Sequence, residues 1–80
     1  MEIKPEIIQR CATGLAQDNL AIEPLTKYVV SALSALPQEK QEDAIAELSS
    51  ALRERVATEH LKAAAVYDLI GTIKLRLRLV

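Results

Sequence analysis

Apolar residues recur at helical spacing near the first two prolines. After Pro5 they are Ile7, Ile8, Cys11, Ala12, Leu15 and Ala16, and after Pro24 they are Leu25, Tyr28, Val29, Ala32, Leu33 and Leu36. Intervals of three, four and seven place each set on one side of a helix. Proline suits the first turn of a helix, because its missing N–H needs no partner there. The spacing therefore predicts helices over about residues 5–17 and 24–36.

Each of these two helices is followed by residues that disfavour its continuation. Asp18 and Asn19 follow the first, and their side chains compete for nearby backbone groups. Leu36 precedes Pro37 at the end of the second, and a residue before proline is pushed out of the helical region. We predict that the chain turns at both places.

Residues 38–70 contain neither glycine nor proline. They could form one helix of about 50 Å at 1.5 Å per residue. The alternative is a break near Ala57 and Thr58, with Thr58 capping a new helix at Glu59, because threonine followed by an acid is a common helix start. Shorter helices close into a globule more easily than a rod, so we favour the break.

The pattern changes after Gly71. Apolar and basic residues alternate over residues 73–80, which alone is typical of a half-buried strand, while a continued helix is the other possibility. Either geometry leaves leucines uncovered, so we predict that this segment contacts a partner. The predicted interface is Leu69, Ile73, Leu75, Leu77, Leu79 and Val80, with Lys74, Arg76 and Arg78 as its rim. The alternative is a last core element folded back on its own chain.

Together these segments predict an all-α fold, a compact bundle of three or four helices in a single domain over residues 1–80. A chain this short buries only about 60 to 65% of its unfolded surface, so its core needs a disulfide, a metal or a partner chain. Cys11 is the only cysteine and His60 the only histidine, which leaves the partner chain. We therefore expect an oligomer rather than a stable monomer, most commonly a symmetric dimer.

Charge gives no general attraction to nucleic acid or to acidic membranes. Lysine and arginine total 10 against 11 acidic residues, for a net charge of -1. The N-terminal residues do not resemble a signal peptide, and no run of about 18 apolar residues occurs. We predict a cytoplasmic protein with neither a membrane nor a nucleic acid as partner.

Few residues suggest chemistry. Cys11 and His60 are the one available nucleophile and base for cysteine catalysis, but Cys11 lies on the first apolar stripe, where packing is the simpler interpretation. His60 is interpreted as a helix-surface residue. Gly14 and Gly71 are isolated, so there is no phosphate-binding loop. We expect no enzyme activity, no cofactor and no metal.

The resulting hypothesis is a small protein-interaction module, such as an adaptor, an inhibitor or a chaperone-like subunit. A partner chain or a second copy would complete its apolar surface. The alternative hypothesis is a dimeric DNA-binding regulator that uses the basic side chains of Lys74, Arg76 and Arg78.

Overall fold

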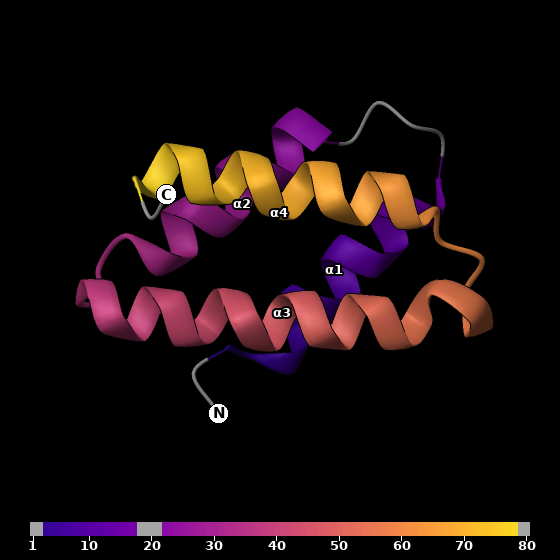
Figure 1. The fold of residues 1–80 in the computed structure, drawn as a ribbon, viewed down its shortest axis with the longest axis horizontal. Helices are drawn as coiled ribbons and strands as arrows, with labels where there is room; N and C mark the ends of the chain where they lie inside the picture. Colours follow the sequence, from indigo (N-terminus) through magenta and orange to yellow (C-terminus); the bar gives the residue numbers. More distant parts are fainter. Residues whose placement is uncertain (1–2, 18–21, 79–80) are drawn as a thin grey trace.

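The computed structural model describes residues 3–17 and 22–78, and most of these residues are helical. The helices are α1 (Pro5–Ala16), α2 (Ile22–Leu33), α3 (Gln38–Thr58) and α4 (Ala63–Leu77) (Figure 1). The all-α prediction is confirmed, since no strand occurs in the described ranges. Pro5 is the first residue of α1, as predicted, whereas α2 begins two residues before Pro24. The predicted turn at Asp18 and Asn19 lies outside the described residues.

Each helix packs mainly against two others, in the cyclic order α1, α2, α4, α3. In Figure 1, α3 and α4 run antiparallel along the long axis of the molecule, and α1 and α2 cross behind them. The chain measures 32 × 23 × 19 Å, and its radius of gyration is 11.4 Å. A compact domain of this length is expected to have a radius of gyration of about 12 Å. The helices therefore enclose one core.

That core takes apolar side chains from all four helices and from the segments next to them. The largest side chains buried within it are Ile3, Leu33, Ile45, Leu48, Leu52, Leu69 and Ile73. The predicted stripe of α1 is confirmed for Ile7, Ile8, Cys11, Ala12 and Leu15, which are buried, but not for Ala16, the last residue of the helix, which is exposed. Burial of one such aliphatic side chain contributes about 1.5 to 3 kcal/mol, so the inward stripes hold the helices together.

The break between the last two helices is confirmed near the predicted position, but the predicted cap is wrong. Thr58 is the last residue of α3, and α4 begins only at Ala63. His60 has a left-handed backbone with φ of 58°. The N–H of buried Leu61 then donates to the Val56 carbonyl at 3.1 Å. This bond and the burial of Leu61 are typical of a Schellman ending, which fixes the turn in place of a threonine cap.

Helix α4 continues through Leu77, so the strand alternative for residues 73–80 is wrong over its described part. Arg78 ends the helix with a left-handed backbone, and its N–H donates to the carbonyls of Leu75 and Lys74. Leu79 and Val80 lie outside the described residues. The alternation of leucines and basic residues therefore lies on a helix, where neighbouring leucines point in different directions.

Candidate functional site

A groove lies between α3 and α4 and is lined by residues of both helices. One part of it, about 400 Å³, is lined by Glu42, Ile45, Ala46, Ser49, Ser50, Arg53 and Lys74. A second part, about 460 Å³, is lined by Ser49, Arg53, Val56, Ala63, Val66, Tyr67, Ile70, Gly71 and Lys74. Because three residues line both parts, the two form one continuous groove, called here the α3–α4 groove.

Small residues on the outer faces of the two helices leave this groove open. On α3 they are Ala46, Ser49 and Ser50, while the larger side chains of this helix turn inward to the core. On α4, a Cβ atom added to Gly71 would meet no atom within 4 Å. Glycine inside a helix costs about 1 kcal/mol relative to alanine. Since nothing in this chain packs against Gly71, its own fold does not require glycine there.

Two large apolar side chains of α4 are exposed: Tyr67 lines the groove, and Leu75 lines a shallower hollow that adjoins it. Tyr67 and Leu75 on α4 are each 69% exposed. They are eight residues apart, so they lie on the same side of the helix about two turns from each other. Val66 and Ile70 are buried and form the apolar floor between the helices. The groove thus has an apolar floor and one large exposed apolar side chain, Tyr67, at its edge.

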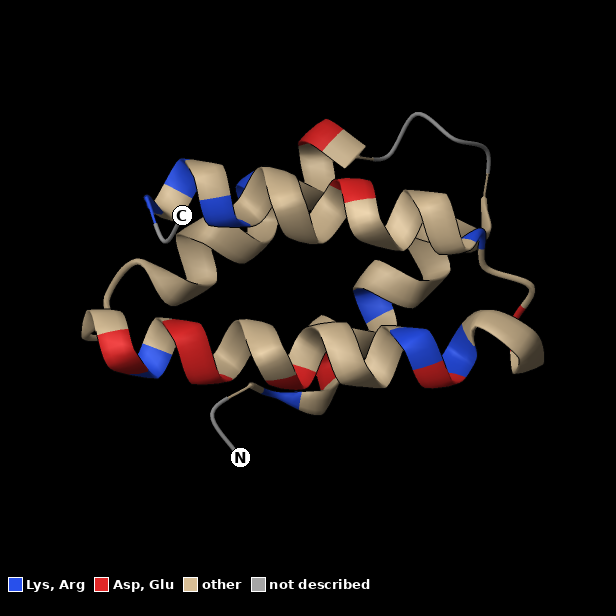
Figure 2. Ribbon diagram, viewed as in Figure 1, with Lys and Arg blue, Asp and Glu red and all other residues tan. Residues whose placement is uncertain are grey.

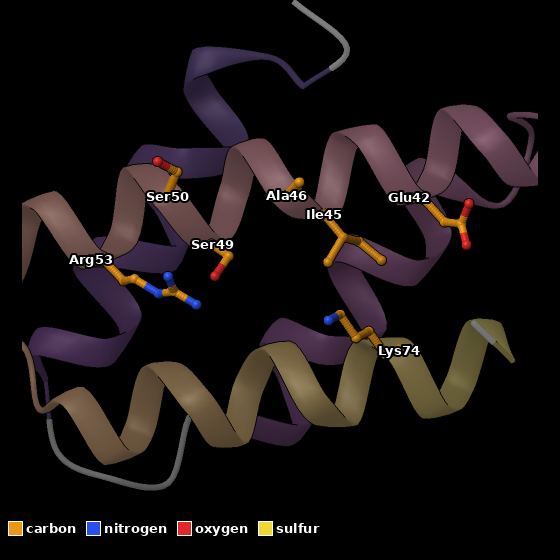
Figure 3. A pocket seen from close by; sticks show the side chains of 7 residues that line it. All are labelled: Glu42, Ile45, Ala46, Ser49, Ser50, Arg53 and Lys74. Carbon is orange, nitrogen blue, oxygen red and sulfur yellow. The ribbon is translucent and has the colours of Figure 1, made fainter. Parts of the chain in front are cut away.

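Charged side chains occupy the groove and its ends. Figure 3 shows Arg53 from α3 and Lys74 from α4 extending into the space between the helices, with Glu42 farther along α3. The guanidinium carbon of Arg53 lies 5.8 Å from the centre of the Tyr67 ring, close enough for a cation–π contact. Within the described ranges, neither Glu42 nor Lys74 forms an ion pair.

The distribution of charge along α3 follows its direction. Four of its five acidic residues lie in its N-terminal half and both arginines in its C-terminal half, with Lys40 and Glu54 as the exceptions (Figure 2). This arrangement complements the helix dipole. It also gives the outer face of α3 a negative end and a positive end.

The predicted interface residues are divided between the core and the surface. Leu69 and Ile73 are completely buried, and Leu77 is partly buried against the same core. Leu75 is exposed, and the remaining two, Leu79 and Val80, are outside the described residues. A spacing of four places positions 69, 73 and 77 on the inward side of a helix. Of the described set, the folded chain offers Leu75 as its fully accessible contact.

The predicted basic rim also divides. Lys74 lines the groove, whereas Arg76 turns to α2, where its Nη2 donates to Glu23 Oε1 at 2.6 Å. Arg78 lies at the left-handed end of α4. Lys74 and Arg76 thus have different neighbours although they are two residues apart.

Several groove residues were missed by the sequence analysis, namely Glu42, Arg53, Tyr67 and the small residues of α3. Gly71 carried a signal that could have been used, because a glycine inside a helical pattern costs stability and can have a packing or functional reason. In the sequence, the stripe of small residues on α3 is marked only by the lack of large apolar side chains at those positions. Their meaning depends on the neighbouring α4, which sequence spacing does not reveal.

Cys11 and His60 lie in different environments. Cys11 is completely buried in the core, and burial raises the pKa of its thiol from 9.0 to about 11 although nearby Arg10 lowers it in part. His60 is exposed in the turn after α3. A nucleophilic cysteine must form its thiolate, and burial opposes that step here. In the described residues, no three His, Cys, Asp or Glu side chains gather in a way that could hold a metal ion.

Cys11 is expected to be unreactive toward a thiol reagent in the folded protein and to react only after the chain unfolds. Because the pKa of the folded thiol is raised, the unfolded state loses its proton first as the pH increases. The contribution of Cys11 to stability is complete below pH 9 and falls as the pH rises to about 11. The rate of thiol labelling across a denaturant series measures the accessibility of Cys11. Melting curves above pH 9, compared with those of a Cys11→Ala control, measure the loss of stability. Rapid stoichiometric labelling of the native protein would contradict this prediction.

Comparisons with family models, curated proteins and solved structures found no match to this chain. None of the helices in the described ranges has the length and apolar character needed to cross a membrane. The site is therefore interpreted from its own geometry.

Proposed function

We propose that this protein binds another polypeptide, which lies in the α3–α4 groove, and that it catalyses no reaction. The observation that carries the proposal is the exposure of Tyr67 in this groove, with Leu75 exposed in the adjoining hollow on α4. Large apolar side chains grouped at a concave surface are typical of a binding site. The described chain contains no other large apolar side chains that are as exposed.

The energetics of the groove support a contact with another protein. Complete burial of an aliphatic side chain such as Leu75 contributes about 1.5 to 3 kcal/mol. Tyrosine is enriched among the residues that dominate protein interfaces, because it combines a large apolar ring with a polar hydroxyl. The floor formed by Val66 and Ile70 is also apolar. A partner that covers these residues would gain its affinity from a small central area.

The shape of the groove favours a helix as the bound element. A helix can dock into a groove between two other helices. Gly71 and the small side chains of α3 would allow the two backbones to approach closely. Such a module would act as an adaptor, an inhibitor or a chaperone-like subunit.

The geometry gives less support to DNA binding. Recognition of DNA needs basic side chains gathered on one face to contact phosphates. Arg76 is paired with Glu23, while Lys74 lies in the groove. The basic side chains of the last helix are therefore poorly arranged for a shared phosphate surface.

Gly71→Arg is expected to abolish partner capture while the protein stays folded. Arginine has a better helix propensity than glycine, and its side chain would extend into the open groove. Ala32→Arg is the matched control, because Ala32 is a small exposed residue on α2. The measurement is affinity capture from the source cell with wild type and both variants as bait, followed by mass spectrometry.

The expected result is a protein retained by wild type and by Ala32→Arg but lost with Gly71→Arg, all three baits having the same circular dichroism. The retained protein can also be a second copy of this chain, which is detected by adding a form that carries a different tag. Equal retention by all three baits would contradict a role for the α3–α4 groove.

A further inference from the structure

We infer that the partner in the α3–α4 groove is helix α3 of a second copy of this chain, packed antiparallel to the first. In this pair, Glu42 of each copy meets Arg53 of the other. The inference rests on the proposed function and adds to it the identity and the direction of the bound helix.

The outer face of α3 has a pattern that complements itself when reversed. Glu42, Ala46, Ser49 and Arg53 line one part of the groove at intervals of four, three and four. These intervals place them along one stripe of the helix. The stripe has an acid at one end, a base at the other and small residues between them. When two such stripes run antiparallel, each acid faces a base and the small residues face one another.

Charge decides the direction of the pair. An antiparallel pair centred between Ala46 and Ser49 places Glu42 opposite Arg53 of the second copy, twice by symmetry. A parallel pair would instead place like charges together at both ends, which is unfavourable. Glu42 has no ion-pair partner among the described residues of its own chain. The net charge of -1 adds little repulsion between two copies.

Size permits the close contact that this pair requires. Helix axes approach to about 8 Å when the residues between them are small. Glu42 and Arg53 are eleven residues apart, so the two ion pairs would lie about 16 Å from each other, one on each side of the small residues. The second copy's helix would then lie beside α4, where Tyr67 is exposed and Gly71 leaves open space. The same pair thus accounts for the small residues, the glycine and the two charges.

A charge-exchange experiment tests this arrangement. Sedimentation equilibrium is measured for wild type, Glu42→Arg, Arg53→Glu, an equal mixture of these two variants, and the double variant. Each single variant creates like-charge contacts at both ends of the pair, so we expect self-association to weaken by about tenfold to a hundredfold. The mixture and the double variant restore opposite charges and should associate nearly as well as wild type. Lys27→Glu on the exposed face of α2 is the charge control and should associate like wild type.

The possible outcomes separate this inference from the proposed function. If wild type remains at its monomer mass of 8.8 kDa throughout the concentration range, the inference is overturned. Binding of a different protein in the groove would then be tested only by the capture experiment with Gly71→Arg and Ala32→Arg. The inference would also be overturned if the single variants associate as strongly as wild type. It would be overturned as well if the mixture associates no more strongly than either variant alone. Circular dichroism of each variant confirms that a loss of association is not a loss of fold.

Discussion

Leu69→Asp is expected to unfold the protein. Leu69 is completely buried in the centre of α4, and a carboxylate placed there would lose its hydration without gaining a partner. An unpaired buried charge costs several kcal/mol, and the lost apolar side chain adds about 2 kcal/mol or more. Small domains have about 5 to 15 kcal/mol of stability in total, so this one change removes most of it. Circular dichroism at low temperature and a thermal melt measure the effect.

Leu75→Asp, six residues later on the same helix, is the matched control. Leu75 is 69% exposed, so its replacement should change the free energy of unfolding by no more than about 0.5 kcal/mol. The proposed function adds that this variant loses affinity for the partner. If Leu75→Asp unfolds the protein as completely as Leu69→Asp does, Leu75 belongs to the core and is not available to a partner.

A second large effect is expected at the crossing of α1 and α2. A Cβ atom at Gly14 would lie 2.8 Å from Leu25 Cδ1 and 3.2 Å from Leu25 Cγ. The larger side chain of Gly14→Leu would push the two helices apart, and overpacking of this kind costs about 1 to 3 kcal/mol or more. Gly71→Leu meets open space, so it should gain about 0.5 to 1 kcal/mol from its better helix propensity.

Denaturant titration of the two leucine variants beside wild type measures this difference directly. It is done at low protein concentration, where association does not contribute to the stability. Equal stability changes for the two variants would mean that α1 and α2 do not meet at Gly14. The comparison also separates a glycine required by the fold from one that the fold does not require.

Much of the fold could be predicted because local signals agree with each other. Pro5 and the stripe of α1 point to the same helix, and residues 57 and 58 lie at the end of α3, close to the predicted break. The details of that break were predicted incorrectly. Thr58 has a capping residue's chemistry, but burial of Leu61 sets the turn after α3. A tertiary contact thus overrides a local preference.

The C-terminal segment shows why the site was predicted only in part. Its alternating sequence is compatible with both a strand and a helix, and each geometry groups different leucines. In the helix, Leu69 and Ile73 face the core, and Leu75 faces solvent. The groove itself lies between α4 and α3, which is distant in sequence from Tyr67 and Lys74. Periodicity within one segment cannot predict which other segment lies beside it.

The central claim is that the α3–α4 groove binds a polypeptide. Its most direct test is to measure the dissociation constant of the captured partner for wild type, Gly71→Arg and Ala32→Arg. The partner is either another protein or a second copy of the chain. We predict that Gly71→Arg raises this constant by about a hundredfold or more, as expected for blockage of an interface centre, while Ala32→Arg leaves it unchanged. A Gly71→Arg protein that is folded and binds as tightly as wild type would contradict the claim.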